Sequence, residues 1–107
     1  MLHFVADYEV LRKEFKKRVV IDELPVLVIF LDEKIYAIQD KCPHMGASLA
    51  EGSLDSNVVQ CKKHGAKFNI QTGTIVKKAQ VGFIKLPTKK PVIFKTLIEN
   101  GKVYLEL

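Results

Sequence analysis

The chain has 107 residues, 48% of them hydrophobic, and a formal net charge of +5, so we expect residues 1–107 to form one domain around a modest core. Its basic residues form no long run and accompany no nucleic-acid-binding motif, which excludes nucleic acid as the expected partner. We find neither a charged-then-apolar leader nor an apolar run of membrane-spanning length, and therefore expect a cytoplasmic protein with no membrane partner.

The first forty residues alternate short apolar runs with polar turns. Four apolar, partly β-branched runs predict strands at Leu2–Ala6, Val19–Ile21, Val26–Leu31 and Ile35–Ile38. The spacing of apolar residues within Tyr8–Arg18 predicts a short helix, which Asp7 could cap. The segments Asp22–Pro25 and Asp32–Lys34 are typical of turns. His3 falls in the first strand, where we expect a surface or packing residue rather than a ligand.

Cysteine and histidine then occur together as two mixed pairs. One residue separates Cys42 from His44, two residues separate Cys61 from His64, and these pairs hold both cysteines and two of the three histidines. Thiolate and imidazole are common metal ligands. The pattern predicts a metal centre that draws ligands from two loops.

The residues around and after the second pair predict further short strands. Leu49–Gly52 is typical of a compact loop, and Asn100–Gly101 is a type I′ hairpin signal. We expect strands at Val58–Gln60, Lys67–Ile70, Thr74–Val76, Phe83–Leu86, Val92–Ile98 and Val103–Leu107. The whole series predicts an all-β fold, an antiparallel sandwich or small barrel with both ligand pairs on hairpin loops at one end.

Two other uses of these residues stay open at this point. Two cysteines and two histidines also make a redox-inert zinc site, although zinc fingers usually pair like ligands, whereas both pairs here are mixed. A disulfide between Cys42 and Cys61 would suit a secreted protein but leaves His44 and His64 unexplained.

The ligand pattern resembles that of the Rieske proteins, whose signature is Cys-x-His followed by Cys-x-x-His. The resemblance extends to Gly46 and Gly65 beside the histidines, and to Phe68 and Thr72–Gly73 after the second pair. It implies the Rieske fold with two cluster-binding hairpin loops. It also implies a [2Fe-2S] cluster with one iron held by two cysteines and the other by two histidines. The implied ligands are Cys42, Cys61, His44 and His64.

The sequence departs from high-potential Rieske proteins at four positions. Those proteins carry an extra cysteine in each ligand box, where this chain has Ala47 and Lys63. They also carry a serine and a tyrosine that donate hydrogen bonds to the cluster, where this chain has Ala66 and Phe68. Fewer donors stabilise the reduced cluster less, so we expect a midpoint potential of about −150 to 0 mV. This is the pattern of Rieske-type ferredoxins that supply oxygenases.

By this resemblance the chain is a one-electron carrier, monomeric when free, and not itself an enzyme. Its expected partners are proteins: a reductase that supplies electrons and a terminal oxygenase or related enzyme that accepts them. We expect electrons to leave by the exposed edge of His44 and His64, with Lys62, Lys63 and Lys67 steering an acidic partner, although these lysines could simply be solvated. A permanent small subunit of a larger complex and a cluster-based redox sensor are the alternatives.

Imidazole ligation predicts a midpoint potential that depends on pH. A coordinated imidazole can still lose its second ring proton, and a bound cation lowers the pKa at which this happens. We expect the potential to be flat near neutral pH and to fall in alkali, because deprotonation makes the oxidised site more negative. Redox titration at several pH values tests this, and a potential that stays level to about pH 11 would count against imidazole ligands.

Overall fold

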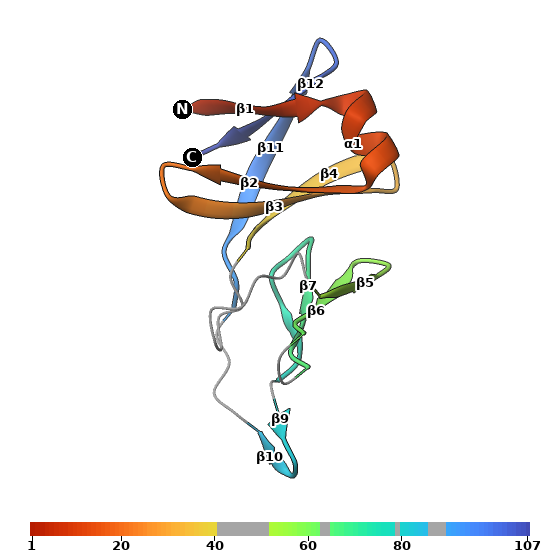
Figure 1. Cartoon of the computed structure of the whole chain (residues 1–107), viewed down its shortest axis with the longest axis vertical. Helices are drawn as coiled ribbons and strands as arrows, with labels where there is room; N and C mark the ends of the chain where they lie inside the picture. The colour runs from red at the N-terminus through yellow and green to blue at the C-terminus, as the bar shows by residue number, and fades with distance from the viewer. Residues whose placement is uncertain (41–51, 63–64, 79, 86–89) are drawn as a thin grey trace.

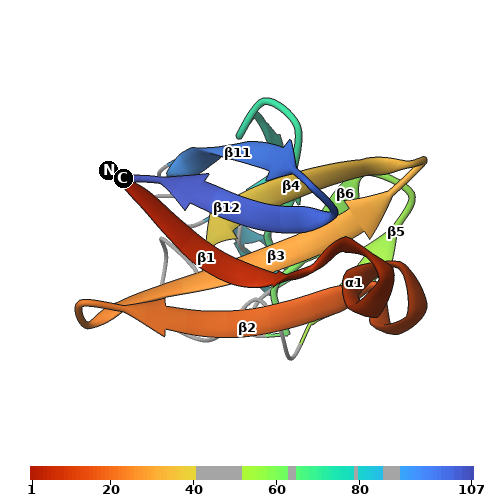
Figure 2. The same ribbon diagram turned by 90° about the horizontal axis from the view of Figure 1, so that it is seen from above.

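In the computed structural model, which describes residues 1–40, 52–62, 65–78, 80–85 and 90–107, six antiparallel strands form a nearly closed barrel (Figures 1 and 2). In order around this barrel sheet they are β1 (Leu2–Asp7), β12 (Lys102–Glu106), β11 (Ile93–Glu99), β4 (Lys34–Gln39), β3 (Leu24–Leu31) and β2 (Lys16–Ile21). Lys17 Nζ on edge strand β2 donates a hydrogen bond to Val5 O on edge strand β1, at 3.3 Å. The predicted all-β antiparallel barrel is confirmed.

Three tight turns join neighbouring barrel strands, and each has two central residues with positive φ. These pairs are Asp22–Glu23, Asp32–Glu33 and Asn100–Gly101. Positive φ at both positions defines the type I′ turn, whose twist matches that of the flanking strands. The hairpin predicted at Asn100–Gly101 is confirmed, but the turn predicted over Asp22–Pro25 is shorter than expected, because β3 already begins at Leu24.

Helix α1 (Tyr8–Glu14) is shorter than the predicted Tyr8–Arg18. Phe15 ends it with φ at 69° and donates its backbone N–H to Leu11 O at 2.8 Å, after which the chain enters β2. A left-handed residue stops a helix because its successor can no longer follow the helical path. The predicted cap by Asp7 is wrong: Asp7 stands at the N-cap, but its side chain makes no capping hydrogen bond.

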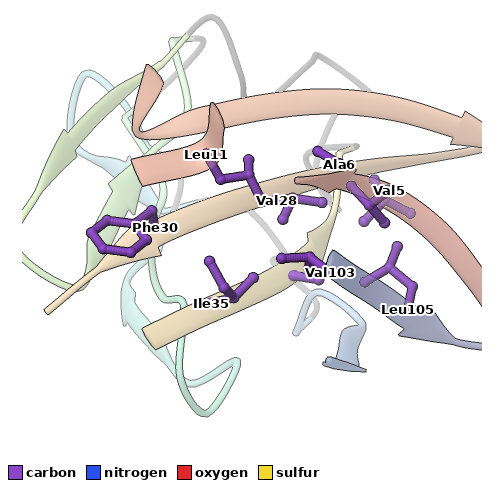
Figure 3. Packing of buried hydrophobic residues seen from close by; sticks show 10 residues of the cluster. Val5, Ala6, Leu11, Val28, Phe30, Ile35, Val103 and Leu105 are labelled. Carbon is purple, nitrogen blue, oxygen red and sulfur yellow. The ribbon is translucent and has the colours of Figure 1, made fainter. Parts of the chain in front are cut away.

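The helix covers one end of the barrel interior. Leu11 is fully buried there, in the same cluster as Val28 and Phe30 of β3 (Figure 3). The Tyr8 ring packs edge-on against Phe30, with 5.5 Å between ring centroids. Desolvation, and next the negative charge of Glu33, raise the pKa of the Tyr8 hydroxyl above its usual value.

Strand β3 is buried on both faces, which explains its unbroken apolar sequence. Successive side chains of a strand point to opposite faces. Val26, Val28 and Phe30 therefore face the barrel interior, whereas Leu27 and Ile29 belong to a second core outside the barrel. Strand β4 alternates in the same way.

The second core lies between the outer face of β3 and β4 and a separate four-stranded sheet, here called the small sheet (Figure 1). Its strands, in order, are β5 (Ser53–Asp55), β6 (Val58–Gln60), β7 (Lys67–Asn69) and β8 (Ile75–Lys77). The second core is completed by buried residues on β6 and β7 and directly next to these strands. They are Val59, Cys61, Ala66, Phe68 and Ile70. The strands predicted around β6, β7 and β8 are confirmed to within one residue at each end, whereas β5 has no counterpart among the predicted strands.

A two-stranded hairpin of β9 (Gln80–Val81) and β10 (Ile84–Lys85) follows the small sheet. The strand predicted at Phe83–Leu86 is wrong at Phe83, which lies in the turn between β9 and β10. Gly82 precedes it with φ at 59°. Leu86 lies outside the described residues, as do residues 49–51 of the predicted compact loop.

Among the residues that the structure describes, no helix is long and apolar enough to cross a membrane.

Gly73 marks a close approach between the small sheet and the start of β11. Its φ is +76°, and a Cβ there would stand 3.0 Å from Ile93 Cγ1 and 3.2 Å from Pro91 O. Because the nearest neighbours are a core side chain and a backbone atom, neither can move away freely. The glycine therefore serves both the turn and the packing of the two sheets.

Gly73→Ala is expected to lower the free energy of unfolding by about 2–4 kcal/mol, through left-handed strain and crowding. The matched control is Gly101→Ala, where φ is +73° and no atom lies within 4 Å of the position that the new methyl group would take. Only the backbone strain of about 1–2 kcal/mol applies there. Chemical denaturation of both variants tests this, and equal losses would show that the contact with Ile93 and Pro91 contributes nothing.

Candidate metal centre

Cys61 lies at the end of β6, where the chain turns towards β7. It is 1% exposed and belongs to the second core with Phe68 and Ile70. Its backbone N–H donates a hydrogen bond to Ala66 O at 2.7 Å. The residues next to these two, Gln60 on β6 and Lys67 on β7, are partners in the strand pairing. The pairing of β6 with β7 therefore closes the base of this turn, and apolar side chains of the second core pack against it. Both interactions hold the Cys61 backbone in place.

Gly65 allows this turn to return to β7. Its φ is +69°, a conformation that costs glycine little and other residues more. A Cβ at Gly65 would also lie 3.3 Å from Nε2 of Gln60, so the position is tight as well as left-handed. The backbone conformation and the lack of space thus explain why a glycine stands at position 65.

Two residues near Cys61 lack the hydroxyl groups that high-potential relatives would carry. Ala66 and Phe68 are both fully buried beside Cys61 in the second core. Neither side chain has a polar hydrogen, so neither can donate a hydrogen bond to a sulfur atom. Because these two residues supply no such hydrogen bonds, we still expect a midpoint potential in the lower part of the Rieske range.

A cavity of about 310 Å³ opens next to Cys61. It is lined by Gly52, Ser53, Gln60, Cys61, Lys62 and Gly65. The donor chemistry that the described residues bring here fits an iron–sulfur centre: a thiol on a closed turn, beside small residues through which a bulky inorganic group can approach. Lys62 is exposed at the rim, and Lys67 is half-buried on β7.

An ion pair fixes the chain where it leaves β4 for the predicted first ligand loop. Arg18 Nε on β2 lies 2.6 Å from Oδ2 of Asp40, whose side chain is fully buried. The Asp40 backbone N–H also donates to Pro25 O at 2.9 Å. Strands β2, β3 and β4 thus meet at Asp40, two positions before Cys42. Sequence reasoning missed this pair, because the partners lie 22 positions apart with no local signal.

A second set of hydrogen bonds orders the predicted Thr72–Gly73 turn. Asn69 Oδ1 accepts the backbone N–H of Gln71 at 2.8 Å and that of Thr72 at 3.3 Å. Gln71 Nε2 then donates to the Tyr36 hydroxyl on β4 at 3.1 Å. The turn is therefore tied to the barrel as well as to its own sheet.

Of the predicted ligands, the structure places Cys61. Cys42, His44 and His64 lie outside the described residues, as do Ala47 and Lys63. His3 lies half-buried on β1, within the barrel sheet. Within the described ranges, no group of three or more histidine, cysteine or acidic side chains gathers as an alternative metal site.

Comparison with known proteins gives consistent matches. Ferredoxin CarAc of Metapseudomonas resinovorans is 34% identical over 86 residues, covering 76% of this chain and 69% of the relative. The 3-phenylpropionate/cinnamic acid dioxygenase ferredoxin subunit of Escherichia coli strain K12 is 36% identical over 90 residues, covering 81% of this chain and 77% of the relative.

Solved structures match over nearly the full chain. A chain in the complex of reduced oxygenase and oxidized ferredoxin in carbazole 1,9a-dioxygenase has a TM-score of 0.80 at 28% identity, covering 97% of this chain and 91% of that one. The ferredoxin of carbazole 1,9a-dioxygenase from Nocardioides aromaticivorans IC177 has a TM-score of 0.81 at 19% identity, covering 98% and 96%, and shows the shared fold.

The fold, the cysteine-bearing turn and these matches define an iron–sulfur protein of the ferredoxin type. Residues 2–88 match the Rieske [2Fe-2S] domain. The chain belongs to the Rieske [2Fe-2S] domain family. The predicted [2Fe-2S] cofactor is thereby confirmed against the zinc site and the disulfide. The predicted role as an electron carrier rather than an enzyme is also confirmed, since the matched relatives are ferredoxin components.

Arg18→Met is expected to lower the free energy of unfolding by about 1–3 kcal/mol, because buried Asp40 loses its charged hydrogen-bond donor. Since Asp40 stands just before the predicted first ligand loop, we also expect the purified variant to retain less iron per chain. The control is Arg12→Met, which breaks the exposed Arg12–Glu9 pair (3.3 Å) on α1 and should cost at most about 1 kcal/mol. Denaturation and iron analysis test both variants, and equal behaviour would refute a special role for Arg18.

Proposed function

We propose that Cys42 and Cys61 hold one iron of the cluster and that His44 and His64 hold the other. We further propose that residues 1–107 form a single Rieske domain that works in the cytoplasm as a monomer when free. The observation that supports this ligand set is the position of Cys61, which is buried on a turn closed by its backbone hydrogen bond to Ala66 O. A cluster held there would accept and release one electron without a bond being made or broken.

The proposed partners are a reductase as electron donor and a terminal oxygenase as electron acceptor. The support is the names of the relatives: one is a dioxygenase ferredoxin subunit, and another matched chain was solved in a complex of oxygenase and ferredoxin. The net charge of +5 favours partners with an acidic docking face. Lys62 is exposed next to Cys61, where it can contribute to this attraction.

The acceptor can be isolated by its dependence on this chain. Extract from the source cell is fractionated while oxygen uptake is followed in the presence of a chemical or enzymatic reductant, with and without the added holoprotein. A fraction whose oxygen uptake requires the holoprotein contains the oxygenase. If no fraction oxidises the reduced chain, the proposed acceptor class is wrong. Size-exclusion chromatography of the same extract separates a free carrier from a permanent subunit.

His64→Cys tests the ligand assignment. Replacing a neutral imidazole by a thiolate makes the cluster site more negative, so we expect the midpoint potential to fall by about 100 mV or more, towards the range of all-cysteine clusters. EPR of the reduced protein should shift towards that of a plant-type ferredoxin. The control His3→Gln removes the third histidine and should leave both readouts unchanged. A coloured His64→Cys protein with the wild-type potential and EPR signal would remove His64 from the ligand set.

A further inference from the structure

The β9–β10 hairpin exposes a group of large apolar side chains. Phe83 at its tip is fully exposed, at 103% of the reference value, Ile84 is 67% exposed and Val81 is 48% exposed. The hairpin projects from the end of the molecule opposite the barrel (Figure 1). Large apolar side chains that are clustered and exposed often mark an interaction site.

The hairpin presents Phe83 in a defined turn. Gly82 has φ at 59°, whereas Phe83 is not among the residues with positive φ. This combination is that of a type II′ turn, which needs glycine at the first central position. Gln80 Nε2 donates to Gly82 O at 2.5 Å across the turn. An ordered turn lowers the entropy cost of placing Phe83 in a partner.

Positive charge lies beside the base of this hairpin. A cavity of about 470 Å³ between β8 and the hairpin is lined by Ile75, Val76, Lys77, Lys78, Gln80 and Lys85. Among the residues that the structure describes, this lining holds three ammonium groups and no carboxylate, and all three lysines are exposed. Such a surface attracts acidic side chains over several ångströms and repels other basic surfaces.

Strand register puts the hairpin at the same end of the small sheet as Cys61. Gln60 pairs with Lys67 across β6 and β7, and Lys67 pairs with Lys77 across β7 and β8. Cys61 follows Gln60 directly, and the chain leaves β8 at Lys77 for the hairpin. Helix α1 and the two chain ends lie on the barrel, away from this end (Figure 1).

We propose that the β9–β10 hairpin is the docking element for the terminal oxygenase, whose face would offer an apolar socket for Phe83 ringed by Asp and Glu. This inference rests on the proposed function. A second copy of the chain is a poor occupant, because it would bring Lys77, Lys78 and Lys85 against their own counterparts. The aromatic anchor supplies affinity at the centre of the contact, while the lysines raise the association rate and select an acidic partner.

Stopped-flow oxidation of the reduced holoprotein by the oxygenase purified as above measures the apparent Kd and the association rate at several salt concentrations. We expect Phe83→Ser to raise the apparent Kd about tenfold or more, as truncation of an interface anchor does. Lys78→Glu combined with Lys85→Glu should slow association about tenfold at low salt and flatten its salt dependence.

Two variants control for general effects of lost apolar surface and changed charge. Val20→Ser removes a side chain that is 56% exposed on β2 of the barrel. Lys13→Glu reverses an exposed charge on α1. Both should transfer electrons like the wild type. The midpoint potential and the thermal unfolding midpoint of all variants should stay at wild-type values.

The possible failures are distinguishable. Hairpin variants that behave like the controls would overturn the docking element while leaving the electron carrier intact. If the hairpin variants changed only the rate at which the reductase reduces this protein, the hairpin would not be the docking element for the oxygenase. A shifted midpoint potential in the hairpin variants would place their effect at the cluster and likewise overturn docking. If the wild-type holoprotein reduces no oxygenase, the proposed function and this inference fall together.

Discussion

The structure depends on the burial of β3 from both sides. Residues of even number from Val26 to Phe30 fill the barrel, while Leu27 and Ile29 support the small sheet on the outside. One strand thus links two cores, and every residue in its middle must be apolar. A polar substitution on either face would leave an unsatisfied group in a core. The position of the small sheet relative to the barrel is set by these side chains, and the position of Cys61 follows from it.

The second core also determines the character of the metal centre. Cys61 shares this core with Ala66 and Phe68, so apolar packing and a backbone hydrogen bond help to hold the turn, and neither of these two neighbours carries a hydroxyl group. On the other side, Arg18 and Pro25 hold Asp40 at the end of β4. The barrel therefore supports the turn at Cys61 as well as the end of β4 that leads to the proposed first ligand loop.

Much of the fold could be predicted because its signals are local. Apolar runs located β1, β3, β4 and β11 but only the second half of β2, and Asn100–Gly101 formed a hairpin by its own conformational preference. The ligand spacing indicated the family before any contact was known. By contrast, the Arg18–Asp40 pair depends on how β2, β3 and β4 align with one another. No local sequence pattern predicts this pair. The strands β5 and β9 each hold a single apolar residue, which cannot show a period, and Phe83 in the turn before β10 is as apolar as a strand residue would be.

The two ends of the chain meet at the edge of the barrel. The amino group of Met1 donates to Leu107 O at 3.0 Å across a separation of 106 positions. By contrast, β2 pairs with β3 and β3 pairs with β4 as neighbours in sequence, as do the strands of the small sheet, although β4 also pairs with the later strand β11. During synthesis, both surfaces that support Cys61 precede β12, and closing the longest loop costs the most chain entropy. We expect the cysteine-bearing region to gain order before the barrel closes, which pulsed hydrogen exchange during refolding would reveal as late protection of β1 and β12.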